Sequence, residues 1–213
     1  MQLQEFSSSV FLGFDPGGSQ NYGVAKLVGS HVSTKTVDTI EDAILWAIET
    51  CNGDLPVAAG IDTLLHWATG QSGLRAADKH LKEKYPEVIK SVIAPNSLYG
   101  AMTLGGMGLA LELRKKWPEI SLNETHPKIL YHALSQQPYP RKKISEAVEW
   151  FQEYTGCKHG QSIGNDHEFD AVLSAWSTRQ ALKERWGDLA LLPPTQGQHI
   201  FPVSNINYYW PTK

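Results

Sequence analysis

The sequence predicts an α/β fold with a mixed five-stranded sheet flanked by helices. Three short segments open the chain with only turn residues between them, the first two apolar runs and the third a weak alternation of apolar and polar residues, and a segment of helical periodicity then leads into a fourth run. A strand, a helical crossover and a second strand in one sheet normally run parallel. The fourth run is therefore expected beside the first and parallel to it, after an antiparallel meander of three strands.

Turn chemistry and caps set the limits of these elements. The first strand ends where Asp15 begins the sequence Asp-Pro-Gly-Gly-Ser, and Gly29-Ser30 forms a tight turn between the second and third. Asp38 or Thr39 can cap the following helix, which ends near Asn52-Gly53. This order is typical of a ribonuclease H-like sheet. The expected strands are 10–14, 22–28, 31–37, 57–61 and 119–123.

The second half of the chain is predicted to be mainly helical. Pro127 is expected at the first position of a helix, where the backbone N–H that proline lacks would have no partner within the helix. Gly156 and Gly187 are expected to follow the last two helices. A short strand is expected within 86–94, before Pro95-Asn96. The expected helices are 74–84, a glycine-rich one from about 101 to 117, one beginning at 127, 144–154 and 166–186.

Bulk properties describe an ordinary folded domain. The chain has 213 residues, a formal charge of −3 and only two cysteines, so a disulfide framework and a globally basic nucleic-acid binder are excluded. We expect one domain over 1–190, with an aromatic tail over 191–213 docked on it. No apolar run reaches the roughly 20 residues that cross a bilayer. A cytoplasmic location without membrane attachment is the resulting expectation.

Four acidic residues follow buried segments and are the candidate functional residues. A carboxylate at the point where a buried strand reaches the surface is a common ligand for a divalent cation, and two such cations can activate water against a phosphodiester. Each acid also has a structural interpretation, as a turn, cap or solvated strand-end residue. The metal-binding and catalytic candidates are Asp15, Asp62, Glu124 and Asp170, and the expected ion is Mg²⁺ or Mn²⁺.

The start of the last long helix offers further candidates. His167 and Asp170 share a helix face at a three-residue spacing, and Asp166 is a further potential ligand. His167 is a candidate catalytic residue as a proton carrier, although a histidine in a first helical turn is often a surface residue. Small residues from Ala171 to Ser177 are expected to let this helix lie close to the sheet. The other histidines, including His66, His126 and His132, show no zinc-ligand spacing.

Five short motifs lie within 10–179, namely Phe14–Gly18, Gly60–Asp62, Gly73–Asp78, Glu124–Lys128 and His167–Ala171. Together they resemble the DUF429 family, whose members are predicted to be ribonuclease H-like nucleases. The resemblance implies that Asp15, Asp62, Glu124 and Asp170 are the metal-binding set, and that Arg75 and Asp78 border the site. The last motif also resembles Holliday-junction resolvases, which place an acid or a histidine where His167 stands. Asp166, His167 and Glu168 therefore remain alternatives for the same role.

The leading hypothesis from the sequence is a metal-dependent nuclease acting on DNA or RNA. Asp-Pro-Gly-Gly-Ser is also compatible with a nucleotide-binding phosphotransferase of actin-like type, but that fold uses two such lobes. A non-catalytic binding protein on the same scaffold is the third hypothesis. Basic clusters at 114–116 and 141–143 could contact phosphates or be solvated helix faces. The oligomeric state is open, and the seven tryptophans and aromatic tail are compatible with a homodimer.

Overall fold

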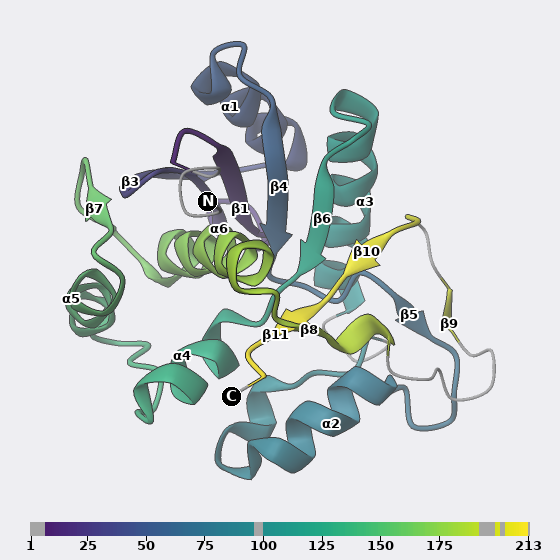
Figure 1. Ribbon diagram of the computed structural model, residues 1–213. Helices are drawn as coiled ribbons and strands as arrows, with labels where there is room; N and C mark the ends of the chain where they lie inside the picture. Colours follow the sequence, from purple (N-terminus) through teal and green to yellow (C-terminus); the bar gives the residue numbers. More distant parts are fainter. Residues whose placement is uncertain (1–6, 96–99, 192–198, 201–202, 213) are drawn as a thin grey trace.

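A computed structural model describes residues 7–95, 100–191, 199–200 and 203–212 (Figure 1). The strands are β1 (Val10–Asp15), β2 (Tyr22–Val28), β3 (His31–Val37), β4 (Pro56–Ile61), β5 (Trp67–Ala68), β6 (Ser121–Glu124), β7 (Lys158–His159), β8 (Gly187–Asp188), β9 (His199–Ile200), β10 (Ile206–Asn207) and β11 (Tyr209–Trp210). The helices are α1 (Ile40–Cys51), α2 (Ala76–Lys84), α3 (Gly100–Lys116), α4 (Pro127–Ser135), α5 (Ile144–Thr155) and α6 (Asp166–Glu184), with 3₁₀ helices η1 (Pro86–Ser91) and η2 (Leu189–Leu191).

The central sheet has the predicted mixed topology. Its order is β10-β6-β4-β1-β2-β3-β7, with β2 antiparallel to β1 and β3, and with β1, β4 and β6 mutually parallel. The five predicted strands form its centre in the ribonuclease H-like order, so the predicted fold class is confirmed. Two-residue strands extend both edges, which makes seven strands in all. Because β1, β4 and β6 are parallel, their carboxyl ends all lie along the same side of the sheet, at the ends of the strands, and this side is called the carboxyl edge below.

Helices cover both faces of this sheet (Figure 1). One buried cluster combines sheet residues such as Phe11 with α4, α5 and α6, and the other combines Leu12 and Phe14 with α1 and α3. Successive residues of β1 therefore serve opposite cores, as the alternation of side chains along a strand requires. This burial on both faces explains the continuous apolar run before Asp15.

Three glycines let α6 lie unusually close to the sheet. A Cβ atom added at Gly13 would lie 1.9 Å from the Ala171 carbonyl oxygen, and one at Gly60 would lie 2.3 Å from that of Ser174. At Gly23 the same atom would lie 2.0 Å from the His167 carbonyl oxygen. Any side chain at these positions would push α6 outward. The close approach comes from small residues on the strands as well as on the helix.

Some predicted boundaries are corrected by the structure. Residues 86–91 of the segment 86–94 form η1 instead of the predicted strand, because Pro86 begins a helical turn. Helix α6 ends at Glu184, earlier than predicted, and Arg185 adopts a left-handed conformation there. Thr39 caps α1 by accepting a hydrogen bond from the Asp42 amide, as expected.

The described part of the C-terminal tail is paired with the domain. Strand β10 lies parallel to β6, and Tyr208 and Trp210 are buried in the same core cluster as α6. The Trp210 indole donates a hydrogen bond to the Tyr85 hydroxyl at 3.0 Å. Residues 192–198 and 201–202 of the predicted tail lie outside the described residues. Among the helices described, none has the length and apolar character that a membrane span requires.

Candidate metal centre

Three aspartates converge at the carboxyl edge of the parallel strands. Asp15 is the last residue of β1, Asp62 directly follows β4, and Asp170 lies in the second turn of α6. One carboxylate oxygen from each lies within 4.8 Å of the others. Three of the four predicted ligands are thus brought together by elements that are far apart in the sequence. The fourth, Glu124, belongs to a neighbouring cluster.

Asp170 is held in place by hydrogen bonds from two residues of the α4 region. The Tyr139 hydroxyl donates to its Oδ1 at 2.6 Å, and the Lys128 ammonium donates to its Oδ2. Lys128 Nζ also lies 5.3 Å from the centre of the Tyr139 ring. Lys128 follows Pro127 in the first turn of α4, so the start of that helix directs a cation into the aspartate cluster.

The three alternative residues at the start of α6 have different surroundings. His167 Nδ1 lies 2.7 Å from Asp15 Oδ2, and His167 Nε2 lies 4.0 Å from Asp166 Oδ1. Asp166 lines a pocket together with Asp62. Glu168 instead accepts hydrogen bonds from the Thr36 hydroxyl and the Gly164 amide. Glu168 therefore ties β3 to the loop before α6, and both of its carboxylate oxygens accept hydrogen bonds there.

Burial and mutual repulsion perturb the acids of this cluster. Burial, followed by the charge of Asp15, raises the pKa of Asp62 well above its ordinary value. Burial raises the pKa of Asp170 to about 6, although Lys128 opposes the change. The hydrogen bond to Asp15 raises the pKa of His167. Ionising all three aspartates without another cation is therefore unfavourable.

We expect Asp62→Asn to stabilise the metal-free protein at alkaline pH. The Asp62 carboxyl has a higher pKa in the folded protein than in the unfolded chain. The folded state therefore loses stability, relative to the unfolded state, as the pH rises from the unfolded pKa through the folded pKa. The variant should gain about 1 kcal/mol in the free energy of unfolding near pH 8 with chelator, and almost nothing near pH 4. Urea unfolding at both pH values measures this. A loss of stability near pH 8 would contradict the repulsion argument.

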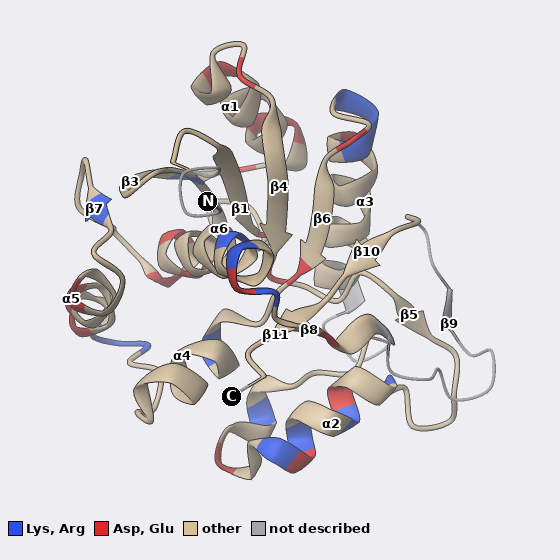
Figure 2. Ribbon diagram, viewed as in Figure 1, with Lys and Arg blue, Asp and Glu red and all other residues tan. Residues whose placement is uncertain are grey.

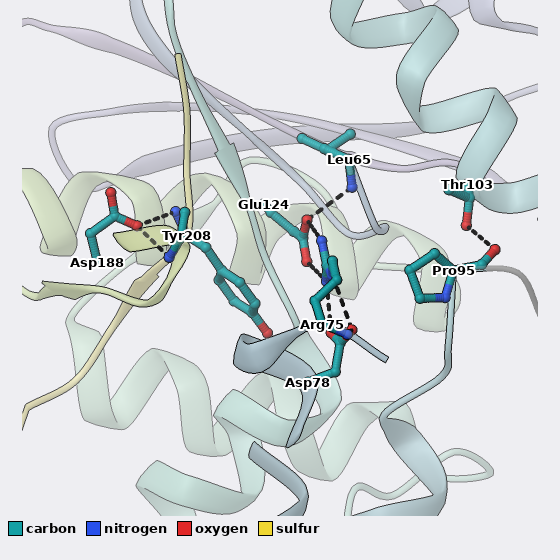
Figure 3. Close-up of polar contacts among 9 residues, drawn as sticks. Leu65, Arg75, Asp78, Pro95, Thr103, Glu124, Asp188 and Tyr208 are labelled. Carbon is teal, nitrogen blue, oxygen red and sulfur yellow. Dashed lines mark hydrogen bonds and ion pairs between the residues drawn. The ribbon is translucent and has the colours of Figure 1, made fainter. Parts of the chain in front are cut away.

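The second cluster is an ion-pair network centred on Arg75 (Figure 3). The Arg75 guanidinium donates to Asp78 at 2.7 and 3.0 Å and to Glu124 at 2.5 and 2.7 Å. The Leu65 amide also donates to Glu124 at 2.9 Å. All three charged residues are buried. Glu124 therefore has a guanidinium as its cation, and the Glu124 charge also contributes to the raised pKa of Asp62.

The charge of Arg75 governs the ionisation of Glu124. Burial by itself would raise the pKa of this carboxyl, but the guanidinium and its hydrogen bonds reverse the direction and lower it. His126 completes a group with Asp78 and Glu124 whose donor atoms lie within 4.8 Å of one another, and burial lowers the His126 pKa. Glu124 is thus kept ionised by the protein itself.

A pocket of about 600 Å³ opens beside Asp62. Its walls include Asp166 from α6 and three basic side chains, Lys90, Lys128 and Arg141. Of the basic group at 141–143, Arg141 therefore lines the same pocket as Asp62. The group at 114–116 lies at the far end of α3 (Figure 2), more than ten residues from the Met102 and Thr103 lining of the pocket.

Sequence reasoning missed two residues of this site. Lys128 is part of the motif Glu124–Lys128. Its position directly after the proline that begins α4 was the one signal that could have placed it near the strand ends. Tyr139 lies between α4 and α5, where no periodicity constrains its position. Its contact with Asp170 depends on the packing of that connection against α6.

Comparisons with known proteins find a structural likeness but no match in sequence. No protein-family model matches the chain, and no curated protein matches its sequence. The resemblance to the DUF429 family therefore stays a prediction. A structure of RuvC from Thermus thermophilus is similar with a TM-score of 0.47 and 11% sequence identity, over 82% of this chain and 96% of that one.

Proposed function

We propose that this protein is a nuclease that uses Mg²⁺ or Mn²⁺ to hydrolyse phosphodiester bonds in nucleic acid. The observation that carries the proposal is the convergence of Asp15, Asp62 and Asp170, with donor oxygens within 4.8 Å, at the edge where three parallel strands end. Clustered carboxylates repel one another, and a divalent cation removes that cost. The same edge opens to a pocket large enough for a substrate.

The donor set fits a hard divalent cation. The three side chains offer only oxygen atoms, which Mg²⁺ and Mn²⁺ prefer. The Lys128 ammonium already forms an ion pair with Asp170. Asp62 makes no side-chain hydrogen bond or ion pair to any other described residue, so its oxygens are available. Asp15 and Asp62 would therefore hold the ion, with Asp170 beside them.

The bound metal would supply water activation and charge stabilisation at the phosphate. The protein's own contribution is to hold and orient the reacting groups. Asp15 fixes the His167 ring through Nδ1, which leaves Nε2 toward Asp166 as a site for a proton. Because the hydrogen bond to Asp15 raises the pKa of His167, this imidazole can hold a proton near neutral pH and donate it to a leaving oxygen.

Charge around the pocket favours a polyanionic substrate. Lys90 and Arg141 are exposed and line the same pocket as Asp62. Positive side chains beside a metal-binding cluster can position phosphates on either side of the bond that is cleaved. Nucleic acid fits this pattern better than an uncharged substrate does.

The test is a cleavage assay with the full chain. End-labelled single-stranded DNA, duplex DNA, RNA and a branched junction are incubated with Mg²⁺ or Mn²⁺, and with chelator as the control. We expect cleavage of at least one substrate that chelator abolishes. Metal binding without cleavage of any substrate would contradict the proposal and favour a binding protein on the same scaffold.

A further inference from the structure

Lys128 is the feature of the site that the proposed function does not itself require. Its ammonium is bonded to Asp170, whose side chain is fully buried, while a quarter of the Lys128 side chain is exposed. Coulombic attraction from Asp62 and Asp15 acts on the same ammonium. Lys128 therefore offsets part of the negative charge of all three aspartates, although it contacts only Asp170.

The three carboxylates are occupied unequally. Both oxygens of Asp170 accept hydrogen bonds, from Tyr139 and from Lys128. Asp15 uses one oxygen for His167. Within the described residues, the Asp62 carboxylate makes neither a hydrogen bond nor an ion pair. The free donor capacity of the cluster thus lies on the side of Asp15 and Asp62, and the side at Asp170 is filled.

Lys128 is anchored, so an incoming ion does not displace it freely. Lys128 is the second residue of α4, directly after Pro127. Its ammonium contacts both the Asp170 carboxylate and the face of the Tyr139 ring. A cation over an aromatic ring in a partly buried site gains attraction from the ring as well as from the carboxylate. Moving Lys128 away would break both contacts and leave a buried carboxylate unpaired.

We propose that the Lys128 ammonium takes the place of a second metal ion, so that the site binds a single divalent cation through Asp15 and Asp62. This inference rests on the proposed metal-dependent function. The three carboxylates and the Lys128 ammonium together carry a net charge of −2, and a protonated His167 makes this charge less negative, so a second divalent cation would leave the site strongly positive. Lys128 is then a positioning residue that holds Asp170 and lies at the wall of the substrate pocket.

The experiment counts the Mn²⁺ ions bound by the metal-free full chain. Free Mn²⁺ is measured by electron paramagnetic resonance during titration of the wild type, Lys128→Gln, Lys128→Arg and Tyr139→Phe. Glutamine removes the charge but keeps a donor for Asp170, arginine keeps the charge, and Tyr139→Phe frees the other oxygen of Asp170 without changing any charge. Thermal unfolding verifies that each variant is folded.

We expect one ion per chain in the wild type, Lys128→Arg and Tyr139→Phe. Lys128→Gln should bind two ions, or bind its first ion at least about tenfold more tightly, because a neighbouring positive charge has gone. Two ions in the wild type, or an unchanged count and affinity in Lys128→Gln, would overturn the inference and leave the nuclease proposal intact. No binding by any variant would overturn both.

Discussion

Replacing Asp15 with asparagine is expected to lower metal-dependent cleavage by about a thousandfold or more. Asp15 takes part in two features of the site. Its carboxylate belongs to the aspartate cluster, and it also holds the His167 ring. Losing the negative charge weakens the metal site, and a metal ion contributes several kcal/mol to transition-state stabilisation. The measurement is the initial rate of cleavage of the best substrate at saturating Mn²⁺.

Folding should survive this change. Apart from the contact with His167, which is partly exposed, the Asp15 side chain lies among acids that repel it. Asp54→Asn is the matched control, since Asp54 is an exposed aspartate in the turn after α1 and lies outside both clusters. It should cleave at the wild-type rate. An Asp15→Asn protein that keeps a tenth or more of the wild-type rate would contradict the role assigned to Asp15.

Replacing Arg75 with methionine is expected to lower the free energy of unfolding by about 3–5 kcal/mol. The guanidinium is the counter-ion of two buried carboxylates, Asp78 and Glu124, and donates four hydrogen bonds to them. Methionine keeps an unbranched apolar stem in place of the alkyl part of Arg75 and removes the guanidinium, so charge and hydrogen bonding are lost. Both carboxylates would be left buried without a partner cation. Urea unfolding at neutral pH measures the change.

An exposed ion pair of the same spacing provides the control. Lys115 lies 3.5 Å from Glu112, and both side chains are mostly exposed. Lys115→Met should change stability by no more than about 0.5 kcal/mol, because solvent screens the pair. Combining Arg75→Met with Asp78→Asn and Glu124→Gln should recover part of the lost stability. A loss below about 1 kcal/mol in Arg75→Met would show that the network is not a stabilising centre.

The centre of the sheet was predictable because β1, β2 and β4 are largely apolar runs bounded by turn chemistry and β3 alternates buried and exposed residues. The edge strands β7 and β10 were not, since two residues carry no periodicity. The segment after Tyr85 was wrongly predicted as a strand because Val88 and Ile89 have high β propensity. The segment pairs with no described strand, and the helical turn that begins at Pro86 prevailed over this propensity.

The candidate site was predictable to the extent that its ligands end parallel strands. Asp15 and Asp62 follow from topology alone, and Asp170 follows from the small residues that bring α6 to the sheet. Glu124 obeys the same strand-end rule, yet its surroundings depend on Arg75, which is 49 positions away in the sequence. A spacing argument places a carboxylate at an edge but does not reveal which cation reaches it.

Anomalous diffraction from a crystal soaked in Mn²⁺ tests the central claim most directly. We predict a manganese peak at the Asp15–Asp62–Asp170 cluster, bonded to oxygens of Asp15 and Asp62, with the Lys128 ammonium still against Asp170. No peak is expected at Glu124, whose carboxylate is held by Arg75. A well-ordered cluster without manganese at high Mn²⁺, or a peak only among Asp78, Glu124 and His126, would contradict the account.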